Sequence, residues 1–187
     1  MKYLFFDIET TGVMHWKNGI HQISGLIEID GELKEEFNFL VQPNKDAKIE
    51  PQALEVGNVT LEQIMAYEPM QNVYKKFIEM LSKYVDKFNK KDKFSLVGYN
   101  NASFDNQFLR AWFVQNGDNY FGSWFWSDTK DVMVLASEKL KHVRHTMLDF
   151  KLKTVAKELS IDVEESKLHD ASYDIYLTKE IYKKCTL

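Results

Sequence analysis

The first apolar run of the chain, Tyr3–Phe6, is nearly continuous and rich in β-forming residues. Such a run is typical of a strand that is covered on both faces, and it predicts a strand over 2–12. Two further β-rich runs, 20–30 and 32–42, flank Asp30-Gly31, which is typical of a hairpin turn that pairs its strands antiparallel. Shorter apolar runs at 94–99 and 124–127 complete a predicted sheet of five strands.

The other apolar positions recur at helical spacing. Short helices are expected after Pro51 and after Thr60, which has Gln63 at the capping-box position. A longer helix is expected to open at Pro69 and to pack one stripe into the core: Val73, Phe77, Met80, Leu81, Tyr84 and Phe88. Later helices are predicted over 104–116, over 130–140 with Asp128 as N-cap, after Asp149, and after Asp170. The pattern predicts an α/β fold with helices on both faces of a mixed sheet.

Composition places limits on this picture. With 187 residues and 44% hydrophobic side chains, the chain fits one domain, 1–187. The net charge of -4 gives little long-range attraction to nucleic acid, so local lysines or metal ions would have to supply it. The lone Cys185 allows neither an internal disulfide nor a cysteine zinc site. Without a signal peptide or membrane span in the sequence, we expect a soluble, cytoplasmic protein with no membrane partner.

The first strand ends in two acids, Asp7 and Glu9, which alternation places on one face while Ile8 faces the opposite layer. Carboxylates held together at the end of a buried strand repel each other, and a divalent cation or a shared proton relieves the repulsion. A solvated strand end is the plain alternative. The buried strand before the pair and the turn Thr10-Thr11-Gly12 after it favour metal.

Several other polar or aromatic positions have both a functional and a structural interpretation. Trp16 either stacks on a base or anchors its loop. Asp105, in the first turn of a helix, is explained by the helix dipole alone. The basic loop residues Lys141, His142, Arg144 and His145 either contact phosphate or are simply solvated, and the lysines at 87, 90, 91 and 93 are interpreted as a solvated helix end. Trp112, Trp124 and Trp126 are assigned to the core rather than to an interface.

Taken together, three local sequences resemble the motifs of the DEDDh (DnaQ-like) 3'-5' exonucleases, a family with the ribonuclease H-like fold. These are Asp7-Ile-Glu9-Thr-Thr-Gly12, Asn101-Ala-Ser-Phe104-Asp105 and His169-x-x-x-x-Asp174. The stretches Asp128-Thr129 and 151–159 add to the resemblance, which covers nearly the whole chain. In the sister group a tyrosine stands four residues before the last aspartate; here that position is Asp170, and Tyr173 does not fit the pattern.

The resemblance implies a set of roles for these residues. Asp7, Glu9, Asp105 and Asp174 would hold two Mg²⁺ or Mn²⁺ ions, an arrangement suited to in-line phosphoryl displacement. His169 would take the proton of the attacking water. Thr10, Thr11, Gly12, Asn101 and Phe104 would frame the terminal nucleotide. The departures from the family pattern, at Ile175, Ser160 and 56–60, touch none of the metal ligands.

The resulting prediction is an enzyme that releases nucleoside 5'-monophosphates from the 3' ends of single-stranded DNA, alone or as a proofreading partner of a DNA polymerase. One alternative is the same chemistry on RNA or on very short oligonucleotides, since recognition of the 2'-hydroxyl is not visible in the sequence. Another is a non-catalytic polymerase accessory or nucleic-acid-binding module, which would have no need for all five catalytic positions. The oligomeric state is left open.

Overall fold

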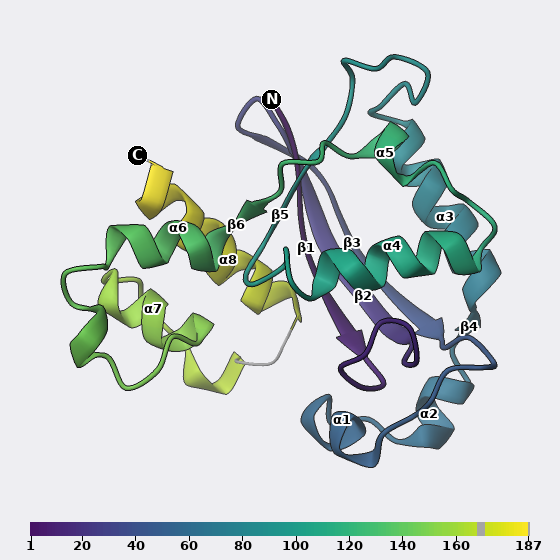
Figure 1. Ribbon diagram of the computed structural model, residues 1–187, viewed down its shortest axis with the longest axis horizontal. Helices are drawn as coiled ribbons and strands as arrows, with labels where there is room; N and C mark the ends of the chain where they lie inside the picture. Colours follow the sequence, from purple (N-terminus) through teal and green to yellow (C-terminus); the bar gives the residue numbers. More distant parts are fainter. Residues whose placement is uncertain (168–170, 187) are drawn as a thin grey trace.

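The computed structural model describes residues 1–167 and 171–186, which form a mixed sheet between two layers of helices (Figure 1). Six strands lie in the order β4-β3-β2-β1-β5-β6. Strand β1 pairs antiparallel with β2 and parallel with β5, β2 pairs antiparallel with β3, and the short β4 and β6 join the edges in parallel. The strands are β1 (Lys2–Thr10), β2 (Ile20–Ile29), β3 (Glu32–Gln42), β4 (Glu68–Pro69), β5 (Ser95–Gly98) and β6 (Lys130–Asp131).

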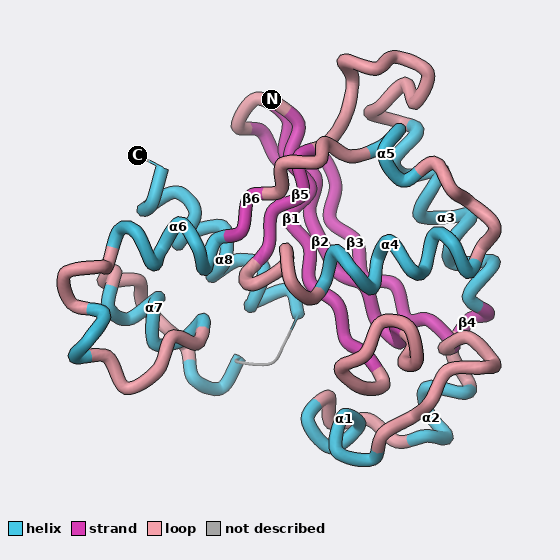
Figure 2. The backbone as a smooth tube through the Cα atoms, in the orientation of Figure 1, coloured by secondary structure: helices cyan, strands magenta, loops and turns pink. Residues whose placement is uncertain are grey.

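Figure 2 shows the helices packed around the sheet that these strands form. They are α1 (Pro51–Val56), α2 (Leu61–Met65), α3 (Met70–Ser82), α4 (Asp105–Gln115), α5 (Phe121–Trp124), α6 (Val132–Lys139), α7 (Leu152–Glu158) and α8 (Ala171–Thr186), with short 3₁₀ turns at Arg144–Thr146 and Glu165–Lys167. None of the helices in the described ranges is long and apolar enough to cross a membrane.

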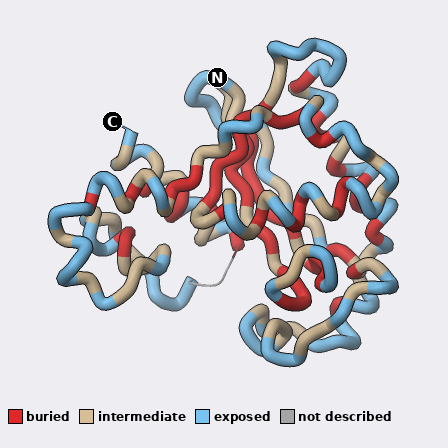
Figure 3. The backbone as a smooth tube through the Cα atoms, in the orientation of Figure 1, coloured by how far each residue is buried: buried red, intermediate tan, exposed pale blue. Residues whose placement is uncertain are grey.

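Alternation along β1 divides the core into two clusters. Leu4, Phe6 and Ile8 pack with α3 and α4, whereas Phe5 packs with α6, α7 and α8 on the other side. The buried residues of Figure 3 therefore lie along the sheet and on the helix faces that cover it. The prediction that Ile8 faces the layer opposite Asp7 and Glu9 is confirmed.

Local sequence signals produced the predicted hairpin and caps. Asp30 and Gly31 have φ of 53° and 85°, the two positive values that a tight turn between right-twisted strands requires. At the start of α2, Thr60 accepts from the Gln63 amide at 3.1 Å and the Gln63 side chain accepts from the Thr60 amide at 2.7 Å. This reciprocal capping box was predicted from the sequence.

The expected five-strand sheet has six strands. The predicted strand 124–127 is absent: residues Phe121–Trp124 form α5, and Phe125 makes only an isolated bridge with Phe94. The aromatic residues of this stretch instead pack as a cluster, with ring centroids 5.1 Å apart between Phe113 and Phe121. The edge strands β4 and β6 have two residues each, too few for an alternating pattern to reveal.

The predicted long helix ends earlier than its apolar stripe indicates. Helix α3 buries Val73, Phe77, Met80 and Leu81, but it stops at Ser82, and Phe88 is 85% exposed. The lysines at 87, 90, 91 and 93 therefore lie in a loop and close no helix. Tryptophans 112 and 124 are buried as expected, and Trp126 is partly buried.

Two predicted N-caps also differ. Asp131, not Asp128, is the N-cap of α6, where it accepts from the amide of Met133 at 3.0 Å. Lys151 is the N-cap of α7, although Asp149 accepts from its amide at 3.1 Å and so still supports that helix start. Asp170, the expected N-cap of α8, lies outside the described residues.

Candidate active site

The candidate site lies where β1 and the neighbouring parallel strand β5 both end. The register pairs Phe5 with Val97, so Asp7 and Glu9 extend to and beyond the carboxyl end of β5. The chain then turns from β5 into α4, whose first residue is Asp105. The carboxyl ends of parallel strands are the usual binding edge of an α/β sheet.

Asp105 joins the two elements directly. Its Oδ1 accepts a hydrogen bond from the backbone amide of Ile8 at 3.3 Å, and its side chain is nearly inaccessible, with the residue 4% exposed. Ile8 is the residue between Asp7 and Glu9. Residues almost a hundred positions apart in the sequence therefore meet at one point.

The acids of this site are close enough to raise one another's pKa. Burial raises the pKa of Asp7 well above its ordinary value, and the charges of Asp105, Glu9 and Asp174 raise it further. Burial also raises the pKa of Asp105 to about 7, against hydrogen bonds from backbone amides that lower it. Four acids from β1, α4 and the first turn of α8 thus share one electrostatic environment.

The donor chemistry of this cluster suits a hard divalent cation. Carboxylate oxygens are the ligands that Mg²⁺ and Mn²⁺ prefer, and a cation would offset the repulsion that raises the Asp7 pKa. Within the described ranges, no three acidic, histidine or cysteine side chains are arranged as a complete metal site. The four carboxylates suit such an ion by their chemistry and by the charge they share around Asp7.

The loop after β1 is tightly bonded internally. The register of β1 and β2 shifts between Glu9 and Thr10, a bulge of the kind that often lies beside binding sites. The Thr10 hydroxyl donates to the carbonyl of Gly12 at 2.7 Å, and the Thr11 hydroxyl donates to the carbonyl of Lys48 at 2.8 Å. Both threonines are buried, so their side chains shape the turn.

Gly12 is required by the close approach of Asn18. A Cβ at position 12 would lie 2.3 Å from the Asn18 side-chain nitrogen, which donates to the Lys48 carbonyl at 2.8 Å. Two large side chains of this loop face solvent: Val13 is 70% exposed and Trp16 is 68% exposed. Trp16 does not anchor its loop by burial, and its ring is accessible for stacking.

The loop between β5 and α4 contains the other predicted substrate residues. Asn101 is fully buried, and its amide donates to the Thr129 hydroxyl at 2.8 Å. The Phe104 ring is partly buried against Phe108, with centroids 5.0 Å apart. Asn101 thus supports the loop from inside; contact of either residue with a nucleotide stays a prediction.

Asp131 is a site residue that the sequence analysis missed. Its Oδ1 accepts from the amide of Asn100 at 3.0 Å, and its Oδ2 accepts from the amide of Ala102 at 3.2 Å, in addition to its bonds at the start of α6. It therefore ties the loop that precedes Asp105 to the neighbouring strand. The sequence gives no sign of this, because two of its donors, the amides of Asn100 and Ala102, lie about thirty residues earlier in the chain.

We expect Asp131→Ala to lower both stability and site occupancy. Removing the carboxylate leaves three partly buried backbone donors without this acceptor, which should lower the free energy of unfolding by about 2 kcal/mol. Denaturant unfolding checks the stability, and a Mn²⁺ titration of the folded fraction checks the site. Asp128→Ala is the control, since that exposed side chain forms a surface ion pair with Lys130 and should change stability by less than about 0.5 kcal/mol. Equal effects of the two changes would contradict the prediction.

A cavity of about 420 Å³ opens beside Asp174, lined by Leu148, Asp149 and the first turn of α7. The loop with Lys141, His142, Arg144 and His145 lies close to this cavity in sequence, but its charges are partly engaged. Lys141 pairs with Glu138, and the Arg144 guanidinium lies 3.5 Å from the centre of the Phe150 ring. His169, the predicted general base, lies outside the described residues. Its role stays a prediction from the sequence.

Comparison with known proteins adds independent information. The family model described as Exonuclease (RNase_T) matches residues 4–182. The chain is 26% identical over 182 residues to the DNA polymerase III PolC-type of Clostridium perfringens, and 23% identical over 182 residues to that of Mycoplasmopsis pulmonis. Each match covers 97% of this chain and 11% of the relative.

Solved structures share the fold. The structure of E. coli Exonuclease I in complex with a dT13 oligonucleotide superposes with a TM-score of 0.77 at 22% identity, over 97% of this chain and 40% of that chain. A zinc-bound form of the E. coli ExoI-ssDNA complex gives a TM-score of 0.76 at 22% identity, over 97% of this chain and 39% of that one. The chain therefore spans only a part of each of these proteins.

Proposed function

Since the chain belongs to the exonuclease family that the RNase_T model describes, we propose that it hydrolyses phosphodiester bonds one nucleotide at a time from the 3' end of a single strand. The observation that carries the proposal is the convergence of Asp7, Glu9, Asp105 and Asp174 on one electrostatic environment at the carboxyl end of β1. A purely structural role would leave this concentration of partly and fully buried negative charge without a purpose.

We propose Asp7, Glu9, Asp105 and Asp174 as ligands of divalent cations, with two Mg²⁺ or Mn²⁺ ions as the natural occupants. When bound, such ions polarise a phosphate and lower the pKa of a water molecule. The protein's own part is to hold the four carboxylates in place: β1 fixes two of them, and the bond from the Ile8 amide holds Asp105 against them. His169 would accept a proton from water, which makes the site one of the DEDDh type.

Single-stranded DNA is the proposed substrate. The Exonuclease I structures that share this fold include one with a dT13 oligonucleotide, and the exposed Trp16 and Val13, in the loop that follows Glu9, offer apolar surface to an unstacked base. We propose that the backbone of Thr10, Thr11 and Gly12 and the Phe104 ring contact the terminal nucleotide. Asn101 would hold the loop that carries Phe104 in place. The product would be a nucleoside 5'-monophosphate.

RNA or very short oligonucleotides are the second candidate substrates. The net charge of -4 gives weak long-range attraction to a long polyanion, which favours a short substrate or one delivered by a partner. The similarity to PolC-type polymerases makes a DNA polymerase a candidate partner. We propose that the chain forms a single exonuclease domain.

The test is a degradation ladder with 5'-labelled single-stranded DNA and RNA of matched sequence, run with Mg²⁺, with Mn²⁺ and with chelator. We expect shortening by one nucleotide at a time from the 3' end, only with metal, and faster on DNA. Faster shortening of RNA would select the second substrate. Absence of any shortening with either metal would overturn the proposed activity.

A further inference from the structure

A second region of the molecule combines positive charge with exposed aromatic surface. The loop 83–93, here called the basic loop, connects α3 to β5. It lies beside Lys2, at the amino end of β1, whereas Glu9 lies near the carboxyl end of the same strand. Glu9 lies seven positions after Lys2 along the strand, which corresponds to roughly 23 Å at about 3.3 Å per residue. The basic loop is therefore at the opposite end of the sheet from the acids (Figure 1).

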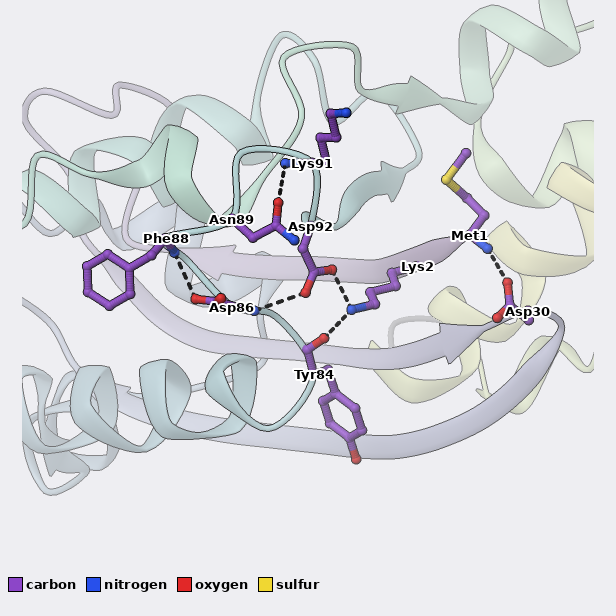
Figure 4. A network of polar contacts seen from close by, with 9 residues as sticks. All are labelled: Met1, Lys2, Asp30, Tyr84, Asp86, Phe88, Asn89, Lys91 and Asp92. Carbon is purple, nitrogen blue, oxygen red and sulfur yellow. Dashed lines mark hydrogen bonds and ion pairs between the residues drawn. The ribbon is translucent and has the colours of Figure 1, made fainter.

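The two acids of the basic loop, Asp86 and Asp92, accept hydrogen bonds from backbone amides of the same loop. Asp86 Oδ1 accepts from the Phe88 amide at 3.0 Å, and Asp92 Oδ2 accepts from the Asp86 amide at 3.1 Å. Asp92 also pairs with Lys2, whose ammonium group donates to the Tyr84 carbonyl as well. Figure 4 shows these carboxylates bonded within the loop. Their charges hold the loop in one conformation, so little ordering would be needed on binding.

Of the five lysines of the basic loop, Lys83 pairs with Glu35 and Lys93 donates to the Gly122 carbonyl. Lys87, Lys90 and Lys91 are exposed, and none of them forms an ion pair within the described ranges. In Figure 4 the Lys91 side chain extends away from Asp86 and Asp92. The loop thus presents three exposed ammonium groups to solvent, while its two carboxylates are hydrogen-bonded to loop amides and one of them is paired with Lys2.

Aromatic rings accompany these charges. Phe88 is 85% exposed, with the Lys87 ammonium 5.4 Å from its ring centre. Trp126 lies next to the loop, with the Lys93 ammonium 5.3 Å from its ring centre. Hollows of about 470 Å³ and about 550 Å³ flank the loop, and Trp126, Lys91 and Lys130 line the larger one.

From this combination we propose that the basic loop is a second contact for single-stranded nucleic acid, which holds the strand remote from the 3' end under hydrolysis. Ammonium groups suit phosphates, and accessible rings suit unstacked bases of any sequence, a combination typical of non-specific single-strand binding. An acidic protein segment would use the lysines but would leave the rings without a role. The inference rests on the proposed function for its substrate class.

The test measures binding and hydrolysis separately. In chelator, fluorescence anisotropy gives the affinity for oligonucleotides of about 30 and about 4 nucleotides, the long one able to reach both ends of the sheet. For the triple variant Lys87→Ala/Lys90→Ala/Lys91→Ala we expect at least about tenfold weaker binding of the long strand. The slope of log affinity against log salt concentration should become less steep by about 2, since each lost phosphate contact removes about 0.7 from it. Metal-dependent hydrolysis of the short strand should be unchanged.

The control variant removes three exposed lysines elsewhere, Lys75, Lys139 and Lys184, and should bind the long strand as the parent does. Phe88→Ala should weaken binding of the long strand without changing the salt slope. Equal losses in the basic-loop and control variants would overturn the proposal, as would unchanged binding in the basic-loop variant. Polyglutamate serves as a probe for acidic protein segments. If the basic-loop variant lost binding to polyglutamate but kept binding to the long strand, the loop would be a site for an acidic protein segment and the proposal would be overturned. A parent that binds the long strand through the loop but hydrolyses nothing would refute only the proposed function.

Discussion

Replacing Asp7 with asparagine is expected to abolish metal-dependent hydrolysis and, at the same time, to stabilise the metal-free protein. Asp7 shares its environment with three other acids, so its loss removes a cation ligand and also a repelling charge. We expect the turnover number to fall by at least about a thousandfold. Thermal unfolding in chelator should give a higher Tm for Asp7→Asn than for the parent, and added Mg²⁺ should stabilise the parent more.

The stability difference should depend on pH in a defined direction. Burial and like charges raise the folded-state pKa values of Asp7 and Asp105, the latter to about 7, so the metal-free fold binds protons that the unfolded chain has released. The stabilisation of the fold by these bound protons is complete below the unfolded-state pKa near 4, and it is lost as the pH rises through the folded-state pKa of about 7 for Asp105. The increase in Tm that Asp7→Asn gives to the metal-free protein should therefore be larger at pH 8 than at pH 5.

His21 does not obscure this comparison. Its burial lowers its pKa to about 4, so it destabilises the fold as pH falls below its ordinary value of 6.5, in parent and variant alike. Asp162→Asn, at an exposed position, is the matched control and should change neither turnover nor Tm appreciably. Full turnover in Asp7→Asn would refute the assignment of the site, and a lower Tm in chelator would refute the electrostatic argument.

Predictions from the sequence succeeded where a short-range rule decides the structure. The Thr60 and Gln63 capping box needs only residues within one turn, and the Asp30-Gly31 turn needs only two positive φ values. The placement of Asp105 in the first turn of α4 was predicted for the same reason. Family motifs then related acids that no local rule connects, and the bond between Asp105 and the Ile8 amide agrees with that grouping.

The errors arose where hydrogen bonds of polar side chains, local in one case and long-range in the other, decided the structure. The stripe that predicted a longer α3 continues in sequence to Phe88, but Asp86 and Asp92 accept hydrogen bonds from nearby backbone amides, which turns the chain into a loop. Asp131 was overlooked because two of its donors, the amides of Asn100 and Ala102, come from a loop about thirty residues earlier. Neither outcome is encoded by hydrophobic periodicity.

His169→Ala is the prediction with the second largest effect. The sequence places this histidine five residues before Asp174, just before α8, and an imidazole with a pKa near 6.5 suits proton transfer from water near neutral pH. We expect the turnover number to fall by about 10²- to 10⁴-fold, with Tm and Mn²⁺ affinity close to those of the parent. Initial rates on a short oligonucleotide, with calorimetry for the metal, measure these quantities.

The matched control is Tyr173→Phe, because tyrosine is the base-position residue of the sister group. The Tyr173 hydroxyl accepts from the Glu164 amide at 2.7 Å, which gives it a structural partner away from the proposed chemistry. Its removal should lower stability slightly and leave turnover within a few-fold of the parent. The pH profile separates the two residues further: the rising limb of the parent's rate near pH 6.5 should disappear in His169→Ala and persist in Tyr173→Phe. If Tyr173→Phe instead lost the limb and His169→Ala kept it, the tyrosine would be the proton acceptor and the histidine would leave the mechanism.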